Sequence, residues 1–571
     1  MKKKTLILLF LIVLLGAFLR LYKLDKFPPS LFGDEVDVGY QAYSILKTGR
    51  DYSGNFLPLS FQSLADWRTP LFLYGTVPFV WFFGLTELGV RFQPALFGIL
   101  TIPIFYLLVR KLFENEILGL LAALFLAISP WHLQYSRAAF EVTQMLFFLI
   151  LGLYLFLIAL KKPWVLPFSA LFLALTPYSY NTAKLFLPVF ILVLVFIFFR
   201  ELRKLSPKWI IITVLTLVLV LGPMVYDIFF GQGGSRFGYL SIFNDPTTAP
   251  EIGFERLEDL KVKLEEVPVG ITPTLSSRIF HNKFLSWGTT FLTNYFRSFS
   301  TEFLFTFGDI NLRHSIQGGF GQLFWLDSLF LLLGFLLLTK IQDMKLKVFL
   351  FSWLLLSPIP SALTQDGGNH ATRLILMLPV FLIFISFGFY GFLGWFKRKT
   401  KKIAISFLLF TFYFLLFGLY LHRYYIHYPL GSEEWWHYGF KELAAYVKQN
   451  ENKYDYVVWS DRDQPPLIFS LFWLKIDPWI VQENKLSWTQ ISDAIWADHL
   501  PGTKYYFGHI SEERIKAGGF IGTLKPNILY LAPEGEIGKD FRYQPIPNSI
   551  KLLDTIYYPS GRIAKYILTG L

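Results

Sequence analysis

The sequence lacks cysteine and is poor in charged residues. Its 571 residues include no Cys, and 16% are Asp, Glu, Lys or Arg, whereas soluble domains carry about 25% charged residues. Without Cys the chain forms no disulfide bond and offers no thiolate nucleophile. The scarcity of charge, beside a hydrophobic content of 54%, excludes a water-soluble fold.

The sequence instead contains long runs of apolar residues. A helix needs roughly 20 apolar residues to cross a bilayer core. The sequence therefore predicts a polytopic α-helical membrane protein with about eleven transmembrane helices. The expected spans lie near residues 6–24, 90–110, 117–135, 142–160, 164–181, 184–200, 209–229, 326–340, 347–364, 374–395 and 403–422.

Basic clusters set the expected orientation, because Lys and Arg gather at the cytoplasmic ends of spans. Such clusters separate apolar runs at 110–111, 161–162, 200–208, 340–347 and 397–402. The run after Lys4 has no small-residue cleavage pattern before Arg20, so we expect an uncleaved first span. We predict a multi-pass protein of the cell membrane, with the N-terminus in the cytoplasm and the C-terminus outside. The net charge of +12 follows from this placement and requires no nucleic acid partner.

The remaining segments are expected on the outer face. They include a first external loop of 25–89 and a long external loop of 230–325. Pro70 to Gly84 is short and contains Pro78, and Phe284 to Phe299 has apolar residues at helical spacing, so both predict helices lying on the membrane surface. From about residue 430, short strands such as 456–459 and 528–531 alternate with polar turns. We therefore expect a transmembrane module of 1–429 and a soluble extracytoplasmic α/β domain of 430–571.

Charged side chains collect at the outer ends of the spans, where acids and arginines lie at one level. A carboxylate there can take a proton from an acceptor while cations hold a phosphate leaving group. Gly33-Asp34-Glu35 is the sharpest candidate, because paired acids at a partly desolvated boundary can have raised pKa values. As a dipeptide alone it also fits a solvated interfacial loop.

The order of the motifs adds specificity. Asp34-Glu35 follows the first span, and Asp66-Trp67-Arg68-Thr69-Pro70, Val90-Arg91-Phe92-Gln93-Pro94-Ala95-Leu96-Phe97-Gly98 and the turn from Arg137 to Glu141 come next. This arrangement resembles the protein O-mannosyltransferase and aminoarabinose transferase families of the C-type glycosyltransferase superfamily, which use polyprenyl-phosphate-linked sugars. The resemblance covers roughly residues 5–200.

The resemblance implies roles for individual residues. Asp34 matches the proposed base, with Glu35 as its partner, and Glu141 matches a second acid that is often Asp in relatives. Arg68 matches a phosphate contact, and Arg91 an arginine close to the site. Further expected substrate-binding residues are Asp66, Arg137, Tyr180, Lys184, Asp309, Arg313, His314, His370 and Arg373.

We therefore expect an inverting glycosyltransferase that moves a sugar from a polyprenyl-phosphate donor to a protein, lipid or glycan acceptor. No metal motif is complete, so a metal-independent reaction is predicted; a divalent ion is the alternative, since some branches of the superfamily use one. Arg91, Arg137 and Arg373 fit interfacial snorkelling as well as phosphate binding. A transporter or flippase of lipid-linked sugars is the main competing class, although inverted repeats and polar residues within spans are not found. A sensor or scaffold acting through the tail is a third.

Overall fold

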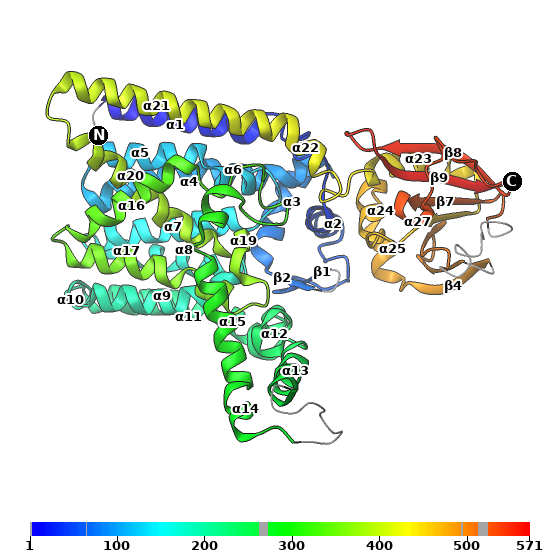
Figure 1. Ribbon diagram of the computed structural model, residues 1–571, viewed down its shortest axis with the longest axis horizontal. Coiled ribbons are helices and arrows are strands. Elements are labelled where there is room, and N and C mark those ends of the chain that lie inside the picture. The colour runs from blue at the N-terminus through cyan, green and yellow to red at the C-terminus, as the bar shows by residue number, and fades with distance from the viewer. Residues whose placement is uncertain (1–2, 64–65, 262–271, 493–494, 512–523) are drawn as a thin grey trace.

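The structure is a computed structural model that describes residues 3–63, 66–261, 272–492, 495–511 and 524–571. Figure 1 shows three parts: a bundle of roughly parallel helices, an arm that projects sideways from one end of the bundle, and a sheet region beyond that same end.

Apolar helices occupy all the predicted spans. They are α1 (Lys3–Leu21), α4 (Glu87–Phe113), α5 (Glu116–Ile128) with α6 (Pro130–Tyr135), α7 (Val142–Ala159), α8 (Leu166–Ser179), α9 (Thr182–Ile197), α11 (Pro207–Phe230), α16 (Trp325–Thr339), α17 (Met344–Leu356), α19 (Ala371–Leu374) with α20 (Leu378–Gly394), and α21 (Lys399–His422). Among the described residues, six helices are long and apolar enough to cross a membrane. The chain is thus a multi-pass membrane protein, and the count of eleven spans remains a prediction.

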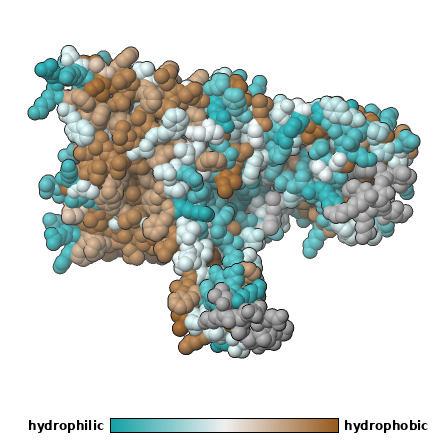
Figure 2. All heavy atoms as spheres, in the orientation of Figure 1, coloured by the Kyte–Doolittle hydropathy of each residue, from teal (hydrophilic) through white to brown (hydrophobic). Residues whose placement is uncertain are grey.

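The surface of the bundle agrees with a membrane position. Figure 2 shows a broad hydrophobic band over the helices, with hydrophilic residues at both ends of the band. The N-terminus and α10 (Phe199–Leu202) lie at the end far from the sheet region (Figure 1), where Lys345 forms an ion pair with Glu201. Two of the segments predicted to be cytoplasmic therefore contact each other at the far end of the bundle.

The opposite end carries the short elements that build the site. Helix α2 (Gly33–Thr48) follows α1, and the hairpin of β1 (Phe61–Ser63) and β2 (Asp66–Arg68) leads into α3 (Pro70–Phe83). Near them lie α18 (Ile359–Ala362) and the 3-10 turns η4 (Gly367–Asn369) and η5 (Ile375–Met377). Helix α3 confirms the predicted helix after Asp66-Trp67-Arg68.

The long loop between α11 and α16 forms the arm. It contains α12 (Ser235–Leu240), η2 (Ile242–Asn244), α13 (Thr248–Lys261), α14 (Leu275–Phe280), α15 (Lys283–Arg297) and the π-helix η3 (Glu302–Thr306). Helix α15 confirms the predicted helix, and it runs across the direction of the bundle helices (Figure 1). Phe284, Leu292 and Phe296 are exposed on it, which is the pattern of a helix lying on a membrane surface.

The C-terminal part is a mixed seven-stranded sheet with helices. Strands β3 (Tyr456–Trp459), β4 (Ser487–Ser492), β5 (Ile495–His499), β6 (Tyr505–Phe507), β7 (Ile528–Pro533), β8 (Ile550–Tyr557) and β9 (Ile563–Gly570) are ordered β4-β5-β6-β3-β7-β9-β8. Strand β3 is parallel to β6 and β7, and the other pairs are antiparallel. The helices of this part are η6 (Arg423–His427), α22 (Tyr428–Gly431), α23 (Phe440–Asn450), η7 (Glu451–Lys453), α24 (Leu467–Leu474), α25 (Pro478–Glu483) and α27 (Glu534–Ile537).

Helix α2 lies between the bundle and the C-terminal part. A Cβ atom added at Gly39 would lie 2.4 Å from the Phe472 ring of α24 and 2.7 Å from Val90 of α4. The side chains of Phe472 and Val90 therefore pack directly on the backbone of α2 at Gly39, and a larger residue there would displace them. The hydroxyl of Tyr40 donates a hydrogen bond of 3.0 Å to the carbonyl of Ile476. These contacts fix α2, and with it the site, against both parts of the chain.

Candidate active site

The first turn of α2 holds two neighbouring acids in different surroundings. Acidic side chains are favoured at a helix N-terminus, and Asp34 and Glu35 occupy that turn. Adjacent residues on a helix point in different directions. The side chain of Asp34 is 52% exposed, whereas that of Glu35 is fully buried. Asp34 thus faces the open site and Glu35 faces the interior.

Arg68 gathers three carboxylates around one guanidinium. Its nitrogens lie 2.7 Å from Asp34, 3.1 Å from Glu141 and 3.5 Å from Asp37. Arg68 ends strand β2, and its Nε also donates to Ser63 across the hairpin at 2.9 Å. The structure therefore brings together Asp34, Arg68 and Glu141, which lie far apart in the sequence, and adds Asp37, which the sequence analysis did not select.

Burial and the nearby arginines shift the pKa values of these acids in opposite directions. Burial alone raises the pKa of Asp34, but Arg68, Arg313 and Arg236 outweigh it and hold this pKa below its ordinary value. Burial raises the pKa of Asp37 to about 6 and also raises that of Glu141. The raised pKa expected of Asp34 is therefore wrong: within this cluster the pKa of Asp34 is lowered, and the pKa values of Asp37 and Glu141 are raised.

Two further arginines, Arg236 and Arg313, act on the charge of Asp34. Arg236 of α12 forms an ion pair of 3.0 Å with Asp66 and follows a Gly-rich turn at the end of α11. The guanidinium of Arg313 lies 4.9 Å from the centre of the Phe32 ring. Arg313 and Asp66 were predicted site residues, whereas Arg236 was not, because it belongs to no motif in its loop.

Glu35 and Arg91 form a closed pair away from the opening. Two nitrogens of Arg91 donate to the two carboxylate oxygens of Glu35 at 2.8 Å each. Arg91 also donates to the carbonyls of Pro28, at 2.9 Å, and Ser30. Glu35 further accepts from the backbone N–H of Ala139 at 2.9 Å. Both side chains are completely buried, so the structure places neither where a substrate in the open site would touch it.

Arg137 and Lys184 also bind backbone. Arg137 is buried and donates to the carbonyl of Leu19, in the last turn of α1, at 2.7 Å and to that of Phe27, in the loop after α1, at 3.1 Å. Lys184 donates to the carbonyl of Gly233 at 2.8 Å, beside the turn that leads to Arg236.

Tyr180 and Arg373 line another side of the acid cluster. Tyr180 is buried directly after α8, and the charges of Arg236, Arg373 and Glu141 all act on it. Arg373 is bound to Asp366 at 2.5 Å and to Thr364 at 2.6 Å. The predicted residues Tyr180 and Arg373 are thus brought to the site from separate external turns.

Asp309, His314 and His370 form a compact group beside Arg373. The carboxylate of Asp309 accepts from Nδ1 of His314 at 2.8 Å and from the backbone N–H of Ala371 at 2.9 Å. The rings of His314 and His370 lie 5.0 Å apart. Within the described parts of the chain, this is the one set of three His or acidic side chains placed to hold a metal ion.

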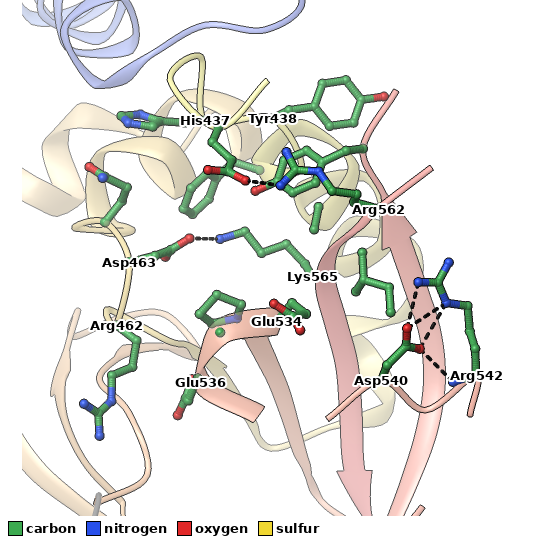
Figure 3. Close-up of a pocket in the computed structure, with 18 residues that line it drawn as sticks. His437, Tyr438, Arg462, Asp463, Glu534, Glu536, Asp540, Arg542, Arg562 and Lys565 are labelled. Atoms are coloured by element: carbon green, nitrogen blue, oxygen red, sulfur yellow. Dashed lines mark hydrogen bonds and ion pairs between the residues drawn. The ribbon is translucent and has the colours of Figure 1, made fainter. Parts of the chain in front are cut away.

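A cavity of about 810 Å³ lies in the C-terminal part. Figure 3 shows charged side chains pointing into it, among them Asp463 paired with Lys565, and Arg562. The wall includes His437, whose Nδ1 accepts from the backbone N–H of Gly33 at 3.2 Å. One residue of the cavity wall therefore contacts α2 at the residue before Asp34. Sequence analysis missed it because its walls come from segments about a hundred residues apart.

Comparisons with known proteins agree with the resemblance seen in the sequence. Residues 68–226 match the family described as dolichyl-phosphate-mannose-protein mannosyltransferase. No curated protein matches the sequence.

Several solved structures are similar at low identity. The oligosaccharyltransferase AglB from Archaeoglobus fulgidus has a TM-score of 0.47 and 15% identity, over 82% of this chain and 64% of that chain. ArnT from Cupriavidus metallidurans has a TM-score of 0.39 and 12% identity, over 99% and 97%. The protein O-mannosyltransferase complex of S. cerevisiae has a TM-score of 0.32 and 19% identity, over 41% and 34%. This chain thus spans less than two thirds of the length of the archaeal enzyme.

The family match begins at a residue of the site. Arg68 opens the matched segment, which also contains Arg91, Arg137, Glu141 and Lys184. Residues 68–226 therefore carry the sequence pattern of the dolichyl-phosphate-mannose-protein mannosyltransferase family, which confirms the resemblance for this part of the chain.

Proposed function

We propose that this chain is a membrane glycosyltransferase that moves a sugar, with inversion, from a polyprenyl-phosphate donor to an acceptor on the outer face of the cell membrane. The observation that carries the proposal is an exposed Asp34 carboxylate held by Arg68 at the end of an apolar bundle. The family match of residues 68–226 supports it. The basic segments at the far end of the bundle support a cytoplasmic position for that end.

Asp34 acts as the base in this proposal. Its lowered pKa keeps it ionised at neutral pH, so it can accept a hydrogen bond from an acceptor hydroxyl or amine and take the proton as the new bond forms. The acceptor atom attacks the anomeric carbon of the sugar, and the bond from that carbon to the phosphate oxygen breaks. The electron pair leaves with the phosphate.

Three arginines surround the place where the phosphate charge develops. Arg68 lies 2.7 Å from Asp34, and the positive charges of Arg236 and Arg313 also lower the pKa of Asp34, so all three would favour an anion bound beside it. A guanidinium binds phosphate through two parallel hydrogen bonds. Such fixed cations stabilise charge that appears in the transition state. Arg373 and Lys184 complete this set at the neighbouring turns.

Glu35, Arg91 and Arg137 take supporting roles in the proposal. Glu35 and Arg91 satisfy each other, and Arg137 binds carbonyls at the end of α1. They hold the loop between α1 and α2, and so the direction in which Asp34 points.

The cavity of the C-terminal part is the proposed acceptor site. It combines acids, bases and the aromatic rings of Tyr438 and Tyr558, a set that suits an acceptor rich in hydroxyl or amide groups. Its wall at His437 is bonded to Gly33. An acceptor bound there would extend toward Asp34, and the chemistry of the cavity admits a peptide or a glycan.

The proposal is tested by the Asp34→Asn variant in a strain that lacks the chromosomal copy. Surface glycans and lipid-linked sugars are compared by mass spectrometry after complementation with the wild type, Asp34→Asn, and the control Asp25→Asn. Asp25 lies in the same external loop and is exposed. Asp34→Asn should lower transfer by about 10²- to 10⁴-fold while the protein elutes as the wild type does in size-exclusion chromatography. Near-normal transfer would remove Asp34 as the base.

A further inference from the structure

Asp309, His314 and His370 bring one carboxylate and two imidazoles together from two external segments. Asp309 and His314 lie on the loop after η3, and His370 precedes α19. The side chains of Asp309 and His314 are 9% and 10% exposed. One ligand atom from each of the three residues lies within 4.8 Å of the others.

Hydrogen bonding alone does not account for the whole group. Asp309 is satisfied by His314, by the N–H of Ala371 and by the N–H of Asn311 at 2.9 Å. Nδ1 of His370 is buried and has no hydrogen-bond partner among the described residues. A buried polar atom without a partner costs free energy unless it is bound by something else.

We propose that Asp309, His314 and His370 bind one divalent transition metal ion of the zinc class. Two imidazole nitrogens and one carboxylate oxygen form a ligand set that zinc and its neighbours in the first row favour. Calcium and magnesium prefer oxygen ligands alone and do not suit it.

The three ligand atoms would have to move only slightly closer together to bind one ion. Zinc ligands lie about 2.0–2.1 Å from the ion, and so roughly 3.3 Å from one another in a tetrahedron. The ligand atoms here lie within 4.8 Å of one another, so they need to approach by up to about 1.5 Å. Three protein ligands leave at least one coordination position open to water or to a ligand.

The ion ties together segments that carry cations of the site. Arg313 precedes His314, and Arg373 lies three residues after His370 in α19. Tyr135 supports the same arrangement: its ring stacks on His314 at 5.9 Å, and its hydroxyl bonds to Thr372 at 2.7 Å. The ion thereby fixes the positions of Arg313 and Arg373. This last step rests on the proposed function, whereas metal binding does not.

The test measures binding of Zn²⁺ and Co²⁺ to the full-length protein in detergent. The protein carries no polyhistidine tag and is treated with a chelator before titration. We expect one ion per chain and a visible Co²⁺ spectrum of a site with nitrogen ligands. His370→Ala and His314→Ala should lose more affinity than the about 10- to 100-fold that removal of an outer-sphere partner costs.

A matched control distinguishes the site from a surface cluster. His281 contacts Glu255 at 2.9 Å and Asp259 at 3.2 Å on the arm, through opposite ring nitrogens. His281→Ala should leave binding unchanged. Loss of binding with this control, or equal binding by wild type and His370→Ala, would overturn the site.

Two measurements keep the test decisive if an alanine variant fails to fold. His370→Gln retains a polar side chain of similar reach, and Zn²⁺ should raise the melting temperature of the wild type and not of this variant. Wild-type protein that takes up no stoichiometric Zn²⁺ or Co²⁺ contradicts the proposal without any variant. None of these readouts uses transferase activity, so failure of the metal site and failure of the proposed reaction are separate results.

Discussion

Two acid–arginine pairs begin at neighbouring positions of α2 and have opposite surroundings. Asp34 lies 2.7 Å from Arg68, and Glu35 lies 2.8 Å from Arg91. The distances are alike, but the carboxylate of Asp34 is half exposed and its arginine is shared with Glu141, whereas Glu35 and Arg91 are buried with backbone groups around them. The two pairs therefore differ in exposure and in remaining hydrogen-bonding capacity, not in length, and this difference is why Asp34 is the proposed base and Glu35 is not.

The largest expected effect is on stability, at the buried pair. Glu35→Gln leaves the charge of Arg91 buried without its counter-ion, and breaking one side of a buried pair costs about 3–5 kcal/mol. We expect a clear fall in the melting temperature of the protein in detergent. Asp34→Asn is the matched control, since the same chemical change one residue earlier affects an exposed group. A Glu35→Gln protein that melts as the wild type does but loses transfer would show that Glu35 takes part in the reaction. The distinction between the two acid–arginine pairs would then be wrong.

The second expected effect is on transfer, at the open pair. Arg68→Lys keeps the positive charge but loses the planar fork that holds Asp34 and Glu141 together. We expect transfer to fall by about 100-fold, which corresponds to ~2.7 kcal/mol in the activation free energy. The measurement is the initial rate of sugar transfer by membranes with equal amounts of each protein. Arg50→Lys, an exposed residue of the same external loop, serves as control; a full rate for Arg68→Lys would argue against bidentate holding by Arg68.

The smallest expected effect concerns Asp37 and pH. Burial raises the pKa of Asp37 from 3.8 to about 6, so between these values the folded protein binds a proton that the unfolded chain releases. This contribution to stability is present below about pH 4 and is lost as the pH rises through about 6. Asp37→Asn removes that dependence, so its melting temperature relative to the wild type should be higher at pH 8 than at pH 5. The gain should correspond to ~1–3 kcal/mol. A relative melting temperature independent of pH would contradict the raised pKa.

Much of the architecture could be predicted from the sequence because the signals are local. Hydropathy located the helices of the bundle, apolar spacing located α15, and the strand expected at 456–459 coincides with β3. Motif order also selected Asp34, Arg68 and Glu141, which the structure gathers within one set of ion pairs. Local patterns sufficed where each element is specified by its own residues.

The remainder depends on contacts between distant segments. The rotation of α2, which exposes Asp34 and buries Glu35, is set by its packing on α4 and α24. Arg236 reaches Asp66 only because the arm folds back over the hairpin. The inward direction of Arg91 and Arg137 depends on which carbonyls the loop before α2 leaves unsatisfied. These contacts join segments far apart in the chain, so the spacing of residues in the sequence does not predict them.

Helix α2 has a consequence for engineering. Its Gly33 N–H, Tyr40 hydroxyl and Gly39 surface all contact residues of the C-terminal part, while its Asp34 is the proposed base. A chimera that exchanges residues after 430 for those of another protein would leave these three positions without matching partners. If the proposed function holds, acceptor preference can be transplanted only when α2 is exchanged together with the C-terminal part, so that the proposed base and the proposed acceptor site are inherited as one unit.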